Sequence, residues 1–83
     1  MTTRLTAQAL EDIADLPASI YARVLHIVER LAKWPAVSGV KPLSGPLAGH
    51  YRIRTGDYRV QFRIEAGTIV VEKVGHRDRF YEE

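Results

Sequence analysis

Four arginines in the middle of the chain have the residue type and the spacing that phosphate binding requires. Arg52 and Arg54 alternate with apolar residues in one segment, and Arg59 and Arg63 do so in the next. A period of two marks a half-buried strand, so the arginines share one face of a sheet. Guanidinium groups bind phosphate oxygens bidentately and stay charged at any working pH. The pattern predicts a sheet with one apolar face and one cationic face suited to a polyanion.

Gly56 and Asp57 separate the two segments and are expected to form a two-residue hairpin loop, with Gly56 at positive φ. This register pairs Thr55 with Tyr58, Arg54 with Arg59, and Arg52 with Gln61. Like charges opposite each other destabilise a ladder by up to about 1 kcal/mol. Folding alone does not favour such a pair, whereas a bound polyanion does.

The elements that must position this hairpin are two helices and further strands. Thr6 is a good N-cap for a helix that ends near Leu16, and Pro17 suits the first turn of a longer helix closed by Trp34-Pro35. Leu10 and Ile13 are expected to be buried on the first helix, and Val24 and Leu31 belong to an apolar stripe with Tyr21 at its margin on the second.

Three weaker strands complete the outline. Residues 1–5 could pair as an edge strand, 40–43 could form a short strand within a loop, and 69–71 lack alternation, as in a central strand covered on both faces. A charged and aromatic tail, residues 75–81, follows directly. We predict an α+β domain: an N-terminal helical hairpin packed on one face of a three- to four-stranded antiparallel sheet.

Composition limits the classes of function. Eighty-three residues make a single domain, 1–83, and a formal net charge of +2 is only mildly basic. The absence of cysteine excludes disulfides and thiolate metal sites, and no run reaches the length of a membrane span. Three scattered histidines do not build a metal site, so we predict no metal, no cofactor and a cytoplasmic location.

Three segments in order carry a family resemblance. They are Leu43-Ser44-Gly45, the hairpin from Tyr51 to Val60, and the end from Val74 to Tyr81. Together with the two preceding helices they resemble the RelE/ParE superfamily of bacterial toxin–antitoxin toxins over nearly the whole chain. The resemblance implies a RelE-like fold related to microbial ribonucleases.

The resemblance also implies an activity. RelE-like toxins enter the ribosomal A site and cut mRNA, the ribose 2′-OH attacking the adjacent phosphate. Carried over by position, the matching residues are Arg52, Arg54, Arg59, Arg77 and Tyr81. With His76 added, the predicted catalytic set is Arg54, Arg59, Arg77, Tyr81 and His76, and the predicted RNA-binding set is Arg52, Arg63 and Arg79. Arg54, Arg59 and Arg77 would neutralise the transition state, and Tyr81 would stack on or orient a base.

This chain departs from the family pattern at Arg52 and Arg54, where the best-known members have lysines. Arginine, whose pKa lies far above any working pH, is a poor general base. His76 and His50 are the nearest alternatives, since an unperturbed imidazole titrates near pH 6.5. His76 is the predicted proton shuttle, although it could equally be a hydrogen-bonded cap, and His50 could be part of a turn.

Three functions remain open at this point. The first is a ribosome-dependent mRNA endoribonuclease that inhibits translation. The second is a ParE-like toxin that acts on DNA gyrase without nuclease chemistry, and the third is a bare nucleic-acid-binding module, for which the arginines are a solvated strand face. Either toxin requires a cognate antitoxin, expected as an acidic or amphipathic segment that covers the arginine face.

Overall fold

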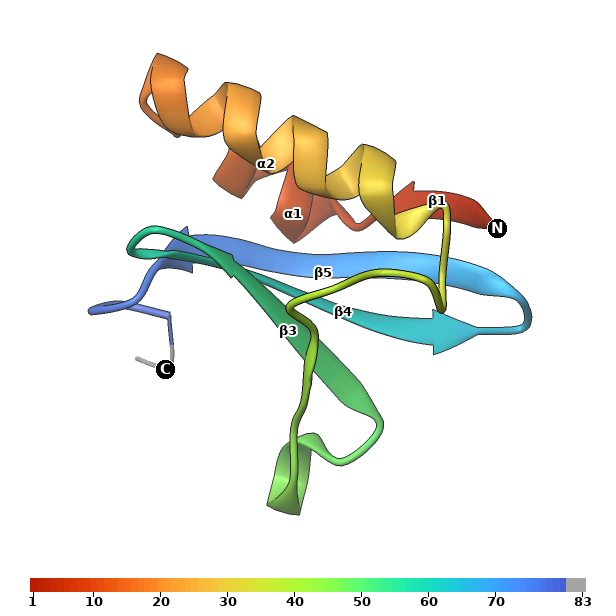
Figure 1. The fold of residues 1–83 in the computed structure, drawn as a ribbon. Helices are drawn as coiled ribbons and strands as arrows, with labels where there is room; N and C mark the ends of the chain where they lie inside the picture. The colour runs from red at the N-terminus through yellow and green to blue at the C-terminus, as the bar shows by residue number, and fades with distance from the viewer. Residues whose placement is uncertain (81–83) are drawn as a thin grey trace.

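Two helices cover one face of a five-stranded sheet in the computed structural model, which describes residues 1–80 (Figure 1). The elements are β1 (Thr2–Leu5), α1 (Ala7–Ala14), α2 (Ala18–Leu31), β2 (Lys41–Pro42), the 3-10 turn η1 (Gly45–Leu47), β3 (His50–Thr55), β4 (Tyr58–Glu65) and β5 (Thr68–His76). The strand order is β1-β5-β4-β3-β2. The predicted α+β class and the helical hairpin on one sheet face are confirmed.

The strand count and the all-antiparallel arrangement were wrong. The sheet has five strands, and β1 pairs in parallel with β5, from Thr2 opposite Thr68 to Leu5 opposite Val71. A tight turn fixes the direction of the two hairpins, but β1 and β5 are the first and last strands of the chain. No local turn links them, so their relative direction depends on how the helices return the chain across the sheet.

The helices bury narrower stripes than the sequence pattern predicts. Thr6 caps α1 as expected, its Oγ1 accepting a hydrogen bond from Ala9 N–H at 3.1 Å. Ala9 and Ile13, one turn apart, face the core, whereas Leu10 is 55% exposed, contrary to prediction. The cause is rotation by about 100° per residue, which carries Leu10 off the buried face.

The second helix supplies the larger part of the helical layer. Val24, Ile27 and Leu31 of α2 are buried against the sheet, while Tyr21 is exposed and does not broaden the stripe. The chain leaves the helix before Trp34, whose ring packs edge-on against Tyr51. These contacts fix the apolar face of β3 under the helix and turn the other face outward.

The central hairpin has the predicted register. Thr55 pairs with Tyr58 around Gly56-Asp57, and Gly56 has φ 58°. Ile53, Val60 and Phe62 are buried on the helix side. The arginines alternate with them and therefore lie on the opposite face of the sheet.

Strand β5 is the central strand that the unbroken apolar run predicts. Ile69, Val70 and Val71 are all buried, between β1 on one side and β4 on the other. Further along, Val71 and Val74 both enter the core although they are three residues apart. A regular strand would point them to opposite faces, so the ladder must contain an extra residue.

That extra residue is Glu72. Gln61 pairs with Lys73 and Phe62 pairs with Val71, which leaves Glu72 without a partner across the ladder. The bulge keeps both valines in the core and turns the Glu72 side chain to the face opposite the helices.

Within residues 1–80, neither helix has the length and apolarity needed to cross a membrane.

Candidate functional site

Four cations from three adjacent strands lie together on the face opposite the helices. Lys41 of β2 pairs with Arg52 of β3, and Arg54 of β3 pairs with Arg59 of β4. We call Lys41, Arg52, Arg54 and Arg59 the cationic face. A hollow of about 290 Å³ is lined by Gly39, Lys41, Arg52 and Arg54. The structure thus brings together Arg52, Arg54 and Arg59, three of the four predicted strand arginines.

Arg54 and Arg59 keep their charge unpaired within the described part of the chain. Arg54 is exposed, and no carboxylate of residues 1–80 lies within ion-pair distance of either arginine. Nη1 of Arg59 is buried without a hydrogen-bond partner. A buried donor without an acceptor is unfavourable by about 1–3 kcal/mol. Within residues 1–80, this nitrogen of Arg59 is therefore not held by an internal acceptor.

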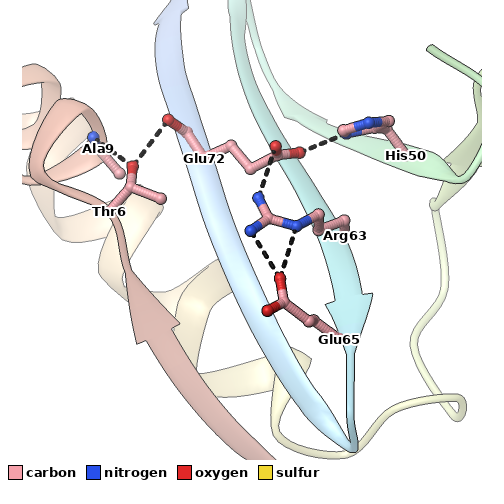
Figure 2. Close-up of polar contacts among 6 residues, drawn as sticks. All are labelled: Thr6, Ala9, His50, Arg63, Glu65 and Glu72. Carbon is pink, nitrogen blue, oxygen red and sulfur yellow. Dashed lines mark hydrogen bonds and ion pairs between the residues drawn. The ribbon is translucent and has the colours of Figure 1, made fainter.

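Arg63 behaves differently, because two carboxylates hold it (Figure 2). Its Nη2 donates to Glu65 Oε2 at 2.7 Å and its Nη1 to Glu72 Oε2 at 2.8 Å. The hydrogen bond to Glu65, followed by that to Glu72, raises the pKa of Arg63. In return the hydrogen bond from Arg63 lowers the pKa of Glu65. Arg63, predicted to bind RNA, is thus neutralised within the fold.

The other oxygen of Glu72 is bound by His50. The His50 Nδ1 lies 2.6 Å from Glu72 Oε1, so one carboxylate bridges β3 and β4 from its bulge in β5 (Figure 2). The backbone oxygen of Glu72 accepts from Thr6 Oγ1 at 3.0 Å, which ties the bulge to the cap of α1. Sequence analysis missed Glu72. The spacing of Val71 and Val74 was the pattern that could have indicated it.

His76 lies on the other side of the sheet from the cationic face. It pairs with Tyr58 at the end of β5, and the two rings meet edge-on with centroids 5.3 Å apart. Its Nδ1 accepts a hydrogen bond from Asp78 N–H at 3.2 Å. Asp12 and Leu16 of the helical layer border the same hollow as His76. The structure therefore does not place this predicted proton shuttle beside Arg54 and Arg59.

The start of the tail is fixed to the hairpin loop. Arg77 N–H donates to the backbone oxygen of Asp57 at 2.7 Å, and Arg77 Nε lies 3.7 Å from Asp57 Oδ1 and 3.5 Å from Asp78 Oδ1. At 57% side-chain exposure these ion pairs are weak and easily exchanged. Arg79 lies beside His76 at the border of a second hollow. Arg77 can thus reach a ligand near the loop.

Phe80 anchors the tail to the sheet. It is 1% exposed, and its Cδ1 lies 3.4 Å from where a side chain on Gly75 would begin. Lys73 Nζ sits 4.8 Å above its ring. Because Gly75 pairs with Arg59, the tail is held next to the cationic face. Tyr81, the predicted base-stacking residue, lies outside the described residues.

No metal centre is found in the described chain. Among residues 1–80, no three histidine, aspartate or glutamate side chains gather closely enough to hold an ion. The chemistry that this surface can perform with its own groups is the binding of phosphate by guanidinium and proton transfer by imidazole.

Two helices on one face of a mixed sheet form the fold of the RelE-like class of small toxins. The chain matches the family model for the ParE toxin of the type II toxin–antitoxin system parDE over residues 3–81, and it belongs to this family. The predicted resemblance is confirmed.

Two relatives support this assignment. The chain is 39% identical to Toxin RelG of Mycobacterium tuberculosis, over 96% of this chain and 94% of that protein. It is 28% identical to Toxin RelE3 of Methanocaldococcus jannaschii, over 88% of this chain and 86% of the relative. This is a RelE-like toxin.

Solved structures agree with the fold. The RelBE2 toxin–antitoxin complex of Mycobacterium tuberculosis contains a chain with a TM-score of 0.80 and 37% identity, covering 92% of this chain and 96% of that chain. The isolated RelE toxin of E. coli has a TM-score of 0.75 at 16% identity, covering 90% of this chain and 82% of that chain, and it bears on the fold alone.

Proposed function

We propose that this toxin is a ribosome-dependent endoribonuclease that cuts mRNA and thereby stops translation. The observation that carries the proposal is the cationic face, in which Arg54 opposes Arg59 and neither is neutralised by residues 1–80. Repulsion between these groups is unfavourable for folding, and a phosphate placed between them would relieve it. Two relatives with RelE-type names, RelG and RelE3, support the same function.

The proposed reaction breaks the RNA chain by attack of a ribose 2′-OH on the adjacent phosphate. Negative charge builds up on the non-bridging oxygens of the phosphorane, and fixed cations aimed at them lower the barrier. Arg52, Arg54 and Arg59 would supply these cations from the hairpin, and Arg52, which pairs with Lys41, also extends the binding surface toward β2. Arg77, beside the hairpin loop, would contact the RNA at the edge of the face.

A gyrase-directed ParE-like activity is the alternative. The family model carries the ParE name, but both named relatives are RelE-type toxins. A toxin that acts without nuclease chemistry has no need for unpaired arginines opposite each other on a strand pair. The RelE-type function is therefore the better supported of the two.

A cognate antitoxin is the proposed regulator. Relatives of the chain have been solved as RelB–RelE complexes, from Methanococcus jannaschii and from Pyrococcus horikoshii among others. The cationic face would attract an acidic segment that becomes ordered as it binds. Such a segment would silence the toxin by occupying the surface that mRNA requires.

The test is cleavage of a defined mRNA on purified ribosomes, with mapping of the new ends. Cuts at codon-related positions are expected for the wild-type chain, and R54A and R59A should each lower the rate at least 10-fold. Arg23, exposed on α2, provides a matched control, and R23A should cut like the wild type. Intact mRNA together with DNA breakage in expressing cells would support the gyrase-directed alternative instead.

A further inference from the structure

We propose that His50, oriented by Glu72, is the base that accepts the proton of the attacking 2′-OH. The proposal depends on the nuclease function argued above and assigns its missing group. The starting observation is the short contact of 2.6 Å between His50 Nδ1 and Glu72 Oε1 on the arginine-bearing face of the sheet (Figure 2).

The reaction needs a base that the arginines cannot supply. Guanidinium groups keep their protons at working pH, so Arg52, Arg54 and Arg59 can stabilise charge but not accept a proton. Of the three histidines, His26 is exposed on α2 and His76 lies beside Tyr58 on the helix side of the sheet. His50 alternates with Arg52 and Arg54 along β3 and so shares their face.

The contact with Glu72 sets the tautomer of the ring. A carboxylate can only accept, so Nδ1 must carry a hydrogen, and in the neutral ring the lone pair then lies on Nε2. This is the arrangement in which a carboxylate orients a catalytic imidazole in many hydrolases. Nε2 is the atom left to accept a proton from a substrate.

Glu72 is itself held from two sides, which makes it a positioning residue. Its second oxygen accepts from Arg63 Nη1 at 2.8 Å, and its backbone oxygen accepts from Thr6 Oγ1 at 3.0 Å. At 17% side-chain exposure the carboxylate is largely shielded from solvent, whereas the His50 side chain is 26% exposed. The ring is thus held by a largely shielded carboxylate, and 26% of the His50 side-chain surface stays accessible.

The surroundings of His50 place it next to a phosphate-binding group. The charged groups that face it are Glu72 from β5, Arg63 from β4 and Arg52 on its own strand. The loop before it, residues 43–49, carries no charged side chain. Residues two apart on a strand are separated by about 6.6–6.8 Å, so Arg52 can bind the phosphate whose neighbouring 2′-OH lies over His50.

The proposed step needs no further reactant except water. The 2′-oxygen bonds to phosphorus while its proton passes to His50 Nε2, and the bond from phosphorus to the 5′-oxygen breaks. The leaving 5′-oxygen takes a proton from water, and the imidazolium returns its proton to solvent. The products are a 2′,3′-cyclic phosphate and a 5′-OH end.

The experiment measures single-turnover cleavage of mRNA on ribosomes as a function of pH. The wild-type rate should rise with pH to a plateau, because only the unprotonated ring can accept the proton. H50N keeps a donor to Glu72 but has no ring base. It should cut about 10²- to 10⁴-fold more slowly and lose the rise. Added imidazole should restore part of the rate to H50A, which a purely structural role of His50 would not allow.

Three further variants separate the role of His50 from the roles of Glu72 and of the other two histidines. E72Q presents an amide that can donate to the ring, which favours the wrong tautomer, so its maximal rate should fall while the concentration of half-saturation stays unchanged. H26Q is the matched histidine control and should keep the wild-type profile. H76Q should also keep the rise with pH, and if it alone loses the rise, His76 is the base and the proposal is wrong.

The outcomes distinguish the two proposals. If the wild-type chain cuts no mRNA at any pH, the nuclease function fails. If the wild type cuts and a folded H50N cuts with the same rate and profile, the assignment of His50 fails while the nuclease function stands. Thermal unfolding of each variant shows which of them are folded, and rescue of H50A by imidazole gives a second readout for the same group.

Discussion

Arg54 of β3 lies directly opposite Arg59 of β4, so two arginines occupy one ladder position on the same face of the sheet. The β-bulge at Glu72 places a carboxylate on the same sheet face, but it pairs with Arg63 and His50. Among residues 1–80, carboxylates therefore neutralise Arg63 at one end of the arginine-bearing face, and none pairs with Arg54 or Arg59 at the other end. This difference is what we expect if the charged end binds an anion.

Removing one charge of the opposed pair should stabilise the fold. R54T replaces an exposed arginine with a residue of high β propensity. We expect the free energy of unfolding to rise by a few tenths of a kcal/mol, up to about 1 kcal/mol, because the like-charge contact disappears. Urea denaturation measures this change, and the same variant should lose cleavage. Lower stability in R54T would show that Arg54 has a stabilising partner.

Phe80 should contribute more to stability than its place near the chain end suggests. F80A removes a side chain that is 1% exposed and packs over Gly75. Truncation of a buried phenylalanine lowers the free energy of unfolding by about 3–5 kcal/mol. F80L, which keeps most of the apolar volume, is the control and should lose less. If F80A unfolds at the wild-type urea midpoint, the packing of the tail on the sheet is not significant.

Thr6 should stabilise both the start of α1 and the attachment of α1 to strand β5. Its Oγ1 accepts from Ala9 N–H and donates to the Glu72 backbone oxygen. T6A loses both hydrogen bonds and should be less stable by about 1–2 kcal/mol. T6S keeps the hydroxyl and serves as the matched variant in the same denaturation series. Equal losses in T6A and T6S would show that the methyl group matters and the hydroxyl does not.

The ion pair of Glu65 with Arg63 should make the free energy of unfolding depend on pH in the acidic range. Hydrogen bonding to Arg63 lowers the pKa of Glu65 below its ordinary value of 4.5, so the folded state favours the ionised form. The resulting stabilisation is present above pH 4.5 and disappears as the pH falls through the lower folded-state pKa. E65Q should therefore be less stable than the wild type at pH 7 and equally stable once Glu65 is protonated.

A matched substitution shows whether the dependence of stability on pH is specific to Glu65. Glu29 is exposed on α2 and makes no ion pair within residues 1–80, so E29Q should follow the wild-type dependence on pH. Urea midpoints of the three proteins between pH 2 and pH 7 provide the measurement. A constant difference between E65Q and the wild type at every pH would mean that Glu65 acts through packing and not through its charge.

The local pattern of the chain was sufficient to predict the hairpin and its register. Gly56-Asp57 permits one tight loop, and that loop determines the pairing of Arg54 with Arg59. Thr6 likewise marked the start of α1, because capping depends on residues a few positions apart. Both features depend only on residues that are close in sequence. The alternation of residue types and a few turn and capping residues were therefore sufficient to predict them.

The tertiary structure determines which charged side chains are in contact. His50, Arg63 and Glu72 come from three strands, and their contact depends on an extra residue in β5 that keeps Val71 and Val74 in one core. The parallel pairing of β1 with β5 and the placing of His76 on the helix side arise in the same way. Sequence alone determined that Arg52, Arg54 and Arg59 share one face, since alternation is local. The neutralised end of the sheet and the proposed base follow from long-range packing of the core.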